Sequence, residues 1–356
     1  MCQFEFGQNR CQSILRLRLH QSAALACVCV ALSGCWFPKE NEVVVYVALD
    51  REFSEPILQQ YEETSGVNVL ASYDVESTKS VGLTNQIMIE RSRPRCDLFW
   101  NNEILNTLRL EKQGLLDVYH SPEGDSYPEQ FVSPAGHWHG FAARVRVLVV
   151  NTDKVAPDEM PTSIHDLVDP KWEGQVAVAK PLAGTTATHA ACLFAAWGEE
   201  QASDFFSRLK QNATILSGNK QVAQSVARGE FAFGLTDTDD AFIEKHVNGQ
   251  PIEIIFPDQG DDQMGALFIP NTLAIVKGGP NTEQAKKLVD FLLLAKTEEQ
   301  LAQADSAQFP LHQNSSEISR AAPKEPLKKM DANFHAALES WDTAMAAMTK
   351  LFATAD

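Results

Sequence analysis

The alternation of short apolar runs with helical patterns is the feature that most restricts the fold of this 356-residue chain. Residues 43–48 read Val-Val-Val-Tyr-Val-Ala, a β-branched run typical of a strand that is buried on both faces. Further strand patterns lie at 67–71 and 97–100, and helical patterns at 54–66, 78–90 and 105–113. This βαβαβα order predicts an α/β domain with a mostly parallel sheet.

A second α/β region follows. Residues 144–151 predict a long strand that crosses into a second lobe, and residues 271–276 predict the strand that returns. Between them, strands are expected at 176–179, 231–235, 252–256 and 265–269. We therefore expect a first lobe of residues 43–145 and 272–310, a second lobe of residues 146–271, and a C-terminal helical segment of residues 311–356, with a ligand cleft between the lobes.

The composition restricts the class of partner. Apolar residues make up 44% of the chain and charged residues 22%, which is ordinary for a globular protein with a sizeable core. The formal net charge of -17 argues against nucleic acid, whose phosphates require a basic surface. It also argues against binding to the surface of anionic lipid.

The N-terminal region has the features of a signal peptide. Basic residues between Arg10 and Arg18 precede an apolar run at 22–32, which is too short to span a bilayer. The run ends in Leu32-Ser33-Gly34-Cys35, which resembles the lipobox of bacterial lipoproteins. We expect residues 1–34 to be a signal peptide, Cys35 to be lipidated, and residues 35–42 to be a tether. The protein would then be periplasmic or on the cell surface, anchored to a bacterial membrane by lipid alone. The alternative is an ordinary signal peptide that happens to contain a cysteine.

Only two cysteines remain after Cys35. Cys96 and Cys192 fall in different predicted lobes, so we expect buried free thiols, although a disulfide is possible.

Several short stretches carry a family resemblance through their order and spacing. They include Asp-Leu-Phe-Trp at 97–100, Asp-Pro-Lys-Trp-Glu-Gly at 169–174 and Ile-Pro-Asn-Thr-Leu-Ala at 269–274. The chain resembles family 1 of the bacterial extracellular solute-binding proteins of ABC transporters, in the branch that takes ferric ion, phosphonate or sugar phosphate. The resemblance implies two α/β lobes that close on a ligand by a hinge motion. It also implies delivery of a small molecule to an ABC permease in the inner membrane, and we expect the protein to be a monomer.

The resemblance fails at one informative place. Ferric-binding members of the branch use two adjacent tyrosines in the second lobe, and the matching stretch at 234–241 contains none. The five tyrosines of the chain all precede the second lobe: Tyr46, Tyr61, Tyr73, Tyr119 and Tyr127. This departure counts against ferric iron as the ligand.

A polar cluster replaces the tyrosines. It comes directly after the predicted strand at 231–235, and carboxyl ends of parallel strands border the ligand crevice of α/β sheets. Such oxygens could accept hydrogen bonds from an ammonium group or sugar hydroxyls, or bind a divalent cation. They could also simply cap the next helix. The members of the cluster are Thr236, Asp237, Asp239 and Asp240.

Other candidate ligand residues also follow predicted strands. Gly184, Thr185 and Thr186 open a helix, where free N–H groups favour an anion. The remaining candidates follow the first, second and third strands and should border the cleft from the first lobe. They are Asp50, Ser77, Thr78, Asn102 and Glu103. Capping of the following helix is the alternative role for each group.

Together these residues predict a binding protein for a small polar ligand that is anionic or zwitterionic, such as an organophosphate or phosphonate. The alternatives are a protein that binds ferric or divalent cations for an ABC importer, and a ligand-sensing module. An enzyme is not expected, because the sequence has no nucleophile elbow, P-loop or dinucleotide glycine fingerprint. No cofactor and no dedicated metal-ligand set are expected.

Overall fold

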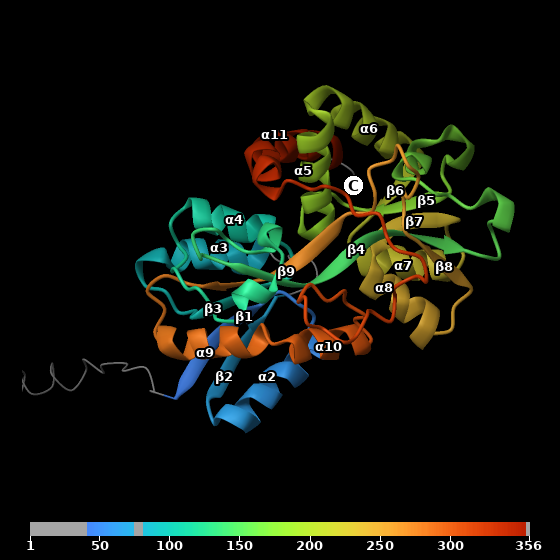
Figure 1. Ribbon diagram of the computed structural model, residues 1–356. Coiled ribbons are helices and arrows are strands. Elements are labelled where there is room, and N and C mark those ends of the chain that lie inside the picture. The colour runs from blue at the N-terminus through green and yellow to red at the C-terminus, as the bar shows by residue number, and fades with distance from the viewer. Residues whose placement is uncertain (1–40, 75–80, 354–356) are drawn as a thin grey trace, which may run out of the picture. The chain divides into compact units, whose positions relative to one another are not determined.

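The central strands of the fold run from one lobe to the other in a continuous ladder. The computed structural model describes residues 41–74 and 81–353. Their strands are ordered β2-β1-β3-β9-β4-β7-β5-β6, and β8 pairs with β4 (Figure 1). The predicted signal peptide, Cys35, Ser77 and Thr78 lie outside the described residues. The α/β class predicted from the alternating patterns is confirmed.

The first lobe contains the parallel strands expected from the sequence. β1 (Glu42–Val47) pairs in parallel with β2 (Asn68–Tyr73) on one side and with β3 (Leu98–Asn101) on the other. The helices of this lobe are α2 (Arg51–Ser65), α3 (Val81–Ile89), α4 (Leu105–Lys112), α9 (Thr282–Leu292) and α10 (Ala295–Gln303). The parallel order brings the carboxyl ends of β1 and β3 to the same edge of the sheet.

Two long strands connect the lobes. β4 (His139–Asn151) is buried along its whole length, and its first half pairs antiparallel with β9 (Phe268–Ile275). Its second half pairs with β7 (Phe233–Asp237) and with β8 (Ile252–Ile255). The two crossing strands expected from the sequence are present, and both are longer than expected.

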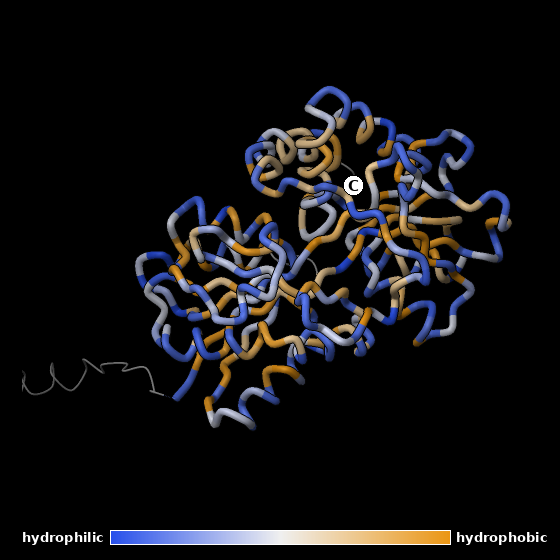
Figure 2. The backbone as a smooth tube through the Cα atoms, in the orientation of Figure 1, coloured by the Kyte–Doolittle hydropathy of each residue, from blue (hydrophilic) through white to orange (hydrophobic). Residues whose placement is uncertain are grey.

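The second lobe is built on β7, β5 (Val176–Ala179) and β6 (Ala213–Leu216), which pair in parallel. Its helices are α5 (Gly184–Trp197), α6 (Glu199–Asn212), α7 (Asn219–Ala227) and the short α8 (Thr238–Phe242). Strand cores are hydrophobic and many of the connecting loops are hydrophilic (Figure 2). Cys96 and Cys192 are buried and free, as expected.

Two element boundaries differ from the sequence-based expectation. α2 begins at Arg51 and not at Ser54, because the Ser54 hydroxyl points inward and donates to the carbonyls of Leu49 and Asp50. β7 continues through Asp237 and not only to Leu235, because Asp237 is the ladder partner of Arg146. Thr236 and Asp237 are therefore strand residues and not part of a loop.

The C-terminal helix contacts both lobes. α11 (Phe334–Phe352) packs against α5 and α6 of the second lobe and also against α4 of the first (Figure 1). The Arg109 guanidinium of α4 lies 5.2 Å from the ring centroid of Trp341. Among residues 41–74 and 81–353, no helix is both long and apolar enough to span a bilayer.

Candidate functional site

A polar cleft lies where the strands of both lobes end. The first lobe contributes Asp50 and Asn102, and β4 contributes Arg144. The second lobe contributes Ala179, Lys180, Ala183, Gly184, Thr185, Thr186, Ser217, Gly218, Asn219, Asp237, Asp239 and Asp240. The cleft therefore combines fixed positive and negative charges within one small volume.

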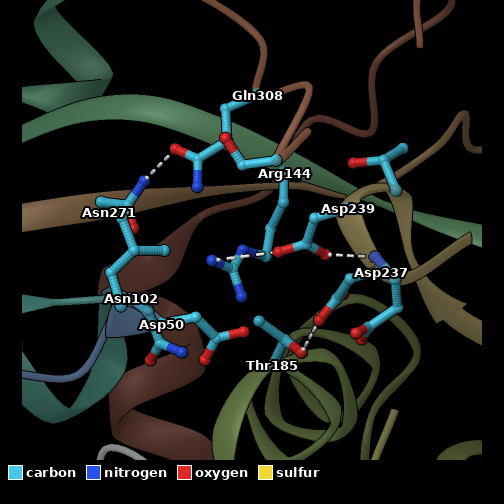
Figure 3. Close-up of polar contacts among 12 residues, drawn as sticks. Asp50, Asn102, Arg144, Thr185, Asp237, Asp239, Asn271 and Gln308 are labelled. Carbon is cyan, nitrogen blue, oxygen red and sulfur yellow. Dashed lines mark hydrogen bonds and ion pairs between the residues drawn. The ribbon is translucent and has the colours of Figure 1, made fainter. Parts of the chain in front are cut away.

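Arg144 is the cationic centre of this cleft. Its Nη2 lies 3.3 Å from Oδ2 of Asp239, and both side chains are about 5% exposed or less (Figure 3). Within the described part of the chain, Nε of Arg144 has no hydrogen-bond partner, and Nη2 has only its ion pair with Asp239. Burial opposes the charged form, but Asp239, Asp237, Asp50 and Asp240 raise the pKa of Arg144. The guanidinium thus stays charged and keeps donors for a further acceptor.

Arg146 and Asp237 form a second ion pair beneath the first. Nη1 of Arg146 donates to Oδ1 of Asp237 at 2.7 Å. Oδ2 of Asp237 accepts from the Thr185 hydroxyl at 2.5 Å and from Nδ2 of Asn219 at 2.9 Å. Both oxygens of Asp237 are therefore engaged by protein groups.

The protonation of Asp237 follows from these contacts. Burial works against the carboxylate, but Arg146 and Arg144 and the hydrogen bond from Thr185 lower its pKa. Burial lowers the pKa of the neighbouring His189 to about 3, and the charge of Arg146 adds to this effect. The network is a charged pair beside a neutral imidazole.

Two helices direct their amino termini at the cleft. α5 begins at Gly184, whose φ of +58° suits a glycine, and α7 begins at Asn219 after Gly218. No side chain of the described residues caps either helix. The first N–H groups of a helix lack intrahelical partners and carry partial positive charge. With Lys180 they form a surface suited to an anion.

The first-lobe wall presents acceptors. Asn102 is about 2% exposed, and its Oδ1 has no donor among the residues the structure describes. Asp50 is the N-cap residue of α2 and lines the same cleft (Figure 3). This wall is therefore acidic or neutral and suits a donor on the ligand.

Two of the predicted site residues lie elsewhere. Glu103 is fully buried, and its carboxylate accepts from the amides of Leu105 and Asn106 and from the Thr188 hydroxyl at 2.7 Å. It caps α4 and joins α4 to α5, and it does not line the cleft. Thr236 is also fully buried, and its hydroxyl donates to the Asn219 carbonyl. Strand ends position these residues, but their side chains serve the fold.

The sequence interpretation missed the cations of the site, which are Arg144, Arg146 and Lys180. It also missed the amide of Asn219. A signal exists for the first two, since Arg-Val-Arg at 144–146 interrupts an apolar strand and charged residues are rarely buried without partners. Their partners lie about 90 residues away along the chain (Arg146 and Asp237 are 91 apart), so spacing alone does not reveal them.

Comparison with known proteins identifies the family. Residues 101–337 match the bacterial extracellular solute-binding protein family. The chain belongs to this family. It is a family of binding proteins and not of enzymes, which confirms the expected class of function.

Relatives support the same assignment over most of the chain. An uncharacterized protein of Haemophilus influenzae is 28% identical over 335 residues, which cover 90% of this chain and 92% of the relative. The major ferric iron-binding protein of Neisseria meningitidis is 25% identical over 303 residues, covering 83% of this chain and 87% of the relative.

Solved structures share the two-lobe fold. Iron-bound HitA from Pseudomonas aeruginosa has a TM-score of 0.77 at 22% identity and covers 87% of this chain and 99% of its own. The periplasmic binding protein AfuA from Actinobacillus pleuropneumoniae, with fructose-6-phosphate bound, has a TM-score of 0.77 at 23% identity and covers 89% of this chain and 100% of its own. The predicted periplasmic-binding-protein fold is confirmed.

Proposed function

We propose that this protein captures a small organic anion that also carries an ammonium or hydroxyl end, and delivers it to an ABC permease. The observation that carries the proposal is Arg144. It is 3% exposed and faces the cleft, yet its buried Nε finds no hydrogen-bond acceptor among the described residues, and its Nη2 has only the 3.3 Å ion pair with Asp239. A buried donor without a partner costs free energy, which a ligand acceptor would recover.

The anionic end of such a ligand has several donors on one side of the cleft. Arg144 can bind a phosphonate or carboxylate through charge-assisted hydrogen bonds. The uncapped amino termini of α5 and α7 add backbone N–H groups and favourable dipoles. Lys180 adds a further positive charge at the same cleft.

The other end of the ligand would meet acceptors. Asp50, Asp239 and Asp240 supply carboxylates, and Asn102 supplies an amide oxygen. Because Arg146 neutralises Asp237, the three carboxylates of Asp50, Asp239 and Asp240 exceed the two cations Arg144 and Lys180 by about one negative charge. This small negative excess favours a zwitterion or a hydroxylated anion over a simple multivalent anion. An aminoalkylphosphonate or a sugar phosphate fits this description.

A metal ion is the second candidate. Asp237, Asp239 and Asp240 each offer an oxygen, and these oxygens lie within 4.8 Å of one another. The relatives and neighbours described as ferric-binding also favour it. Against it, Asp237 is held by Arg146 and Asp239 by Arg144, so a cation would face two guanidinium groups. We therefore favour the organic ligand.

The test is a titration of the purified protein by calorimetry with 2-aminoethylphosphonate, fructose 6-phosphate and Fe(III). Saturable one-to-one binding of either phosphorus compound, lost in Arg144→Lys, supports the proposal. Binding of Fe(III) alone, lost in Asp239→Asn and Asp240→Asn, would establish the metal-binding alternative.

We also propose that the protein is held at a membrane by lipid on Cys35. The support is the Leu-Ser-Gly-Cys motif directly after an apolar segment. Cells that express the native chain should retain it in the membrane fraction, and cells that express Cys35→Ser should release it. Equal fractionation of both proteins would refute the anchor without touching the ligand proposal.

A further inference from the structure

Strand β4 contains a bulge two residues before Arg144. Phe141 pairs with Asn271 and Ala143 pairs with Pro270, so Ala142 is an extra residue in the ladder with β9. Its φ is +40°, in the left-handed region that alanine seldom adopts. This conformation costs about 1 to 2 kcal/mol and persists only where the surroundings hold it.

The bulge decides which way Arg144 points. Successive side chains of a strand lie on opposite faces, so Arg144 and Arg146 share one face of β4. They use it to reach Asp239 and Asp237. A shift of one residue in register moves every side chain to the other face. If the extra residue were accommodated beyond Arg144 instead of at Ala142, Arg144 would turn away from Asp239.

Side chains from other elements hold the bulge in place. The amide of Ala142 donates to Oε1 of Glu298 on α10, and its carbonyl accepts from Nδ2 of Asn271 on β9. Oε2 of Glu298 accepts from the amides of Leu311 at 2.9 Å and His312 at 2.6 Å. Glu298 therefore joins the bulge to the 311–312 backbone.

The segment held by Glu298 also pairs with β4. The amides and carbonyls of Ala143 and Phe309 exchange two hydrogen bonds, of 2.8 and 2.7 Å. Glu298 is fully buried and has no contact with the cleft. Its three hydrogen bonds all go to backbone amides on either side of this bridge, so it acts on backbone geometry.

We propose that Glu298 is a positioning residue for ligand capture: by holding the amide of Ala142 it fixes the bulge of β4, and the bulge aims Arg144 into the cleft. This inference rests on the proposed role of Arg144 as the anion ligand. Glu298 acts through Ala142 and does not touch the ligand.

The surroundings of Glu298 make its role dependent on pH. Burial raises the pKa of Glu298 to about 7, against the opposing effect of its amide donors. Among the described residues, Tyr127 interacts electrostatically with Glu298, and the His312 ring lies edge-on against Tyr127 with its Nε2 3.8 Å from Oε2 of Glu123. Burial and the carboxylates of Glu298 and Glu123 raise the pKa of Tyr127 well above its ordinary value, so this phenol is neutral. A protonated Glu298 has one acceptor position fewer for the three amides.

The experiment compares wild type with Glu298→Gln, using 2-aminoethylphosphonate as the probe. Glutamine replaces one acceptor oxygen with a donor, so it cannot serve both Ala142 and the 311–312 amides. We expect affinity about tenfold weaker than wild type at about pH 8, converging with it at about pH 6 as Glu298 becomes protonated. The protonation of 2-aminoethylphosphonate itself changes with pH in the same way in both experiments. The ratio of the two affinities therefore reports the effect of Glu298 alone.

The matched control is Asp97→Asn. Asp97 is also buried and accepts from two backbone amides, those of Val44 and Asn281, but it does not line the cleft. It should lose stability and keep its affinity at both pH values. Equal losses of affinity in Glu298→Gln and Asp97→Asn would overturn the proposal, because they would indicate a general effect of destabilisation. So would unchanged affinity in Glu298→Gln.

Glycine at the bulge supplies a rescue. Ala142→Gly adopts a positive φ without strain, so the bulge should depend less on Glu298. The double variant Ala142→Gly with Glu298→Gln should bind the probe more tightly than Glu298→Gln alone, and should fold if the single variant does not. A double variant that behaves no better than Glu298→Gln would contradict the proposal.

A crystal structure separates failure of this inference from failure of the proposed function. If wild type does not bind 2-aminoethylphosphonate, the structure of Glu298→Gln still shows the direction of Arg144. Loss of the bulge at Ala142 and of the Arg144–Asp239 contact supports the positioning role. Retention of both overturns it.

Discussion

Arg146 and Asp237 face each other across β4 and β7 as ladder partners, and their buried side chains form an ion pair of 2.7 Å. Thr185 and Asn219 complete the coordination of the carboxylate. This pair lies at the base of the cleft, which Asp237 lines, and supports the amino termini of α5 and α7, which carry Thr185 and Asn219. All three carboxylates line the cleft, but both oxygens of Asp237 are engaged by Arg146, Thr185 and Asn219. We therefore assign Asp237 a mainly structural role, and Asp239 and Asp240 a role toward the ligand.

Removing Asp237 should destabilise the protein. Asp237→Ala leaves Arg146 charged and buried without its counter-ion, which typically costs about 3 to 5 kcal/mol of unfolding free energy. Urea denaturation followed by tryptophan fluorescence measures this loss. Asp240→Asn, at the more exposed end of the cluster, serves as the control and should cost less than about 1 kcal/mol. Equal effects of the two substitutions would contradict the division of the cluster.

Replacing Arg144 should abolish ligand capture while the protein still folds. Arg144→Lys keeps the charge beside Asp239 but loses the planar arrangement of donors. We expect affinity for 2-aminoethylphosphonate to fall about 100-fold or more by calorimetry, which corresponds to about 3 kcal/mol. Lys180→Gln, which removes a less confined charge of the same cleft, should weaken binding by about tenfold or less. If Arg144→Lys binds as tightly as wild type, Arg144 does not bind the ligand in the way we propose.

Asp240 should determine selectivity for an amine. Asp240→Asn removes a charge from the acidic side of the cleft. Its affinity for 2-aminoethylphosphonate should fall about tenfold, and its affinity for ethylphosphonate, which lacks the amine, should not fall. Competition between the two compounds measures the ratio directly. An equal loss of affinity for both ligands would show that Asp240 does not recognise the ammonium group.

Much of the fold could be predicted because it depends on local patterns. Apolar runs such as 43–48 and 144–151 predicted β1 and much of β4, and amphipathic spacing predicted α9 and α11. The end of β7 was wrong by two residues, because Thr236 and Asp237 are polar and their pairing with β4 is non-local. The contact of α11 with helices of both lobes could not be predicted, because an amphipathic pattern does not show which element the helix packs against.

The site was predicted only in part, because the direction of a side chain and its non-local partners are not visible in a local sequence pattern. The rule that strand ends border a crevice indicated Asp50, Asn102 and the 184–186 turn, which all line one cleft. It cannot tell a side chain that enters the cleft from one that caps a helix, and so it included Glu103. It also cannot find Arg144, which lies within a strand and is oriented by the bulge at Ala142.

The free energy of unfolding should depend on pH through the protonation of Glu298. Its pKa of about 7 in the folded protein exceeds the ordinary value of 4.5, so the folded state binds the proton more tightly. The resulting stabilisation is fully present below about pH 4.5 and is lost as the pH rises through about 7, by about 3 kcal/mol in total. Glu298→Gln should lack this decline, and urea unfolding at several pH values measures the difference between the two proteins.

Buried histidines change the free energy of unfolding with pH in the opposite direction to Glu298. The effect of Glu298 is therefore read from the difference between wild type and Glu298→Gln. Burial lowers the pKa of His139 to about 4 and of His189 to about 3, so both stabilise the fold above about pH 6.5 and lose that effect on acidification. They contribute equally to wild type and Glu298→Gln. A difference curve that is flat between about pH 4.5 and 8 would show that Glu298 does not titrate in this range.

The most direct test of the account is the shift in melting temperature of the purified protein with 2-aminoethylphosphonate, fructose 6-phosphate and Fe(III). A ligand at 100 times its dissociation constant adds about 2.7 kcal/mol of stability, which a thermal scan resolves. The account predicts a shift with 2-aminoethylphosphonate or the sugar phosphate that disappears in Arg144→Lys. A shift with Fe(III) alone, unchanged by Arg144→Lys, would contradict it.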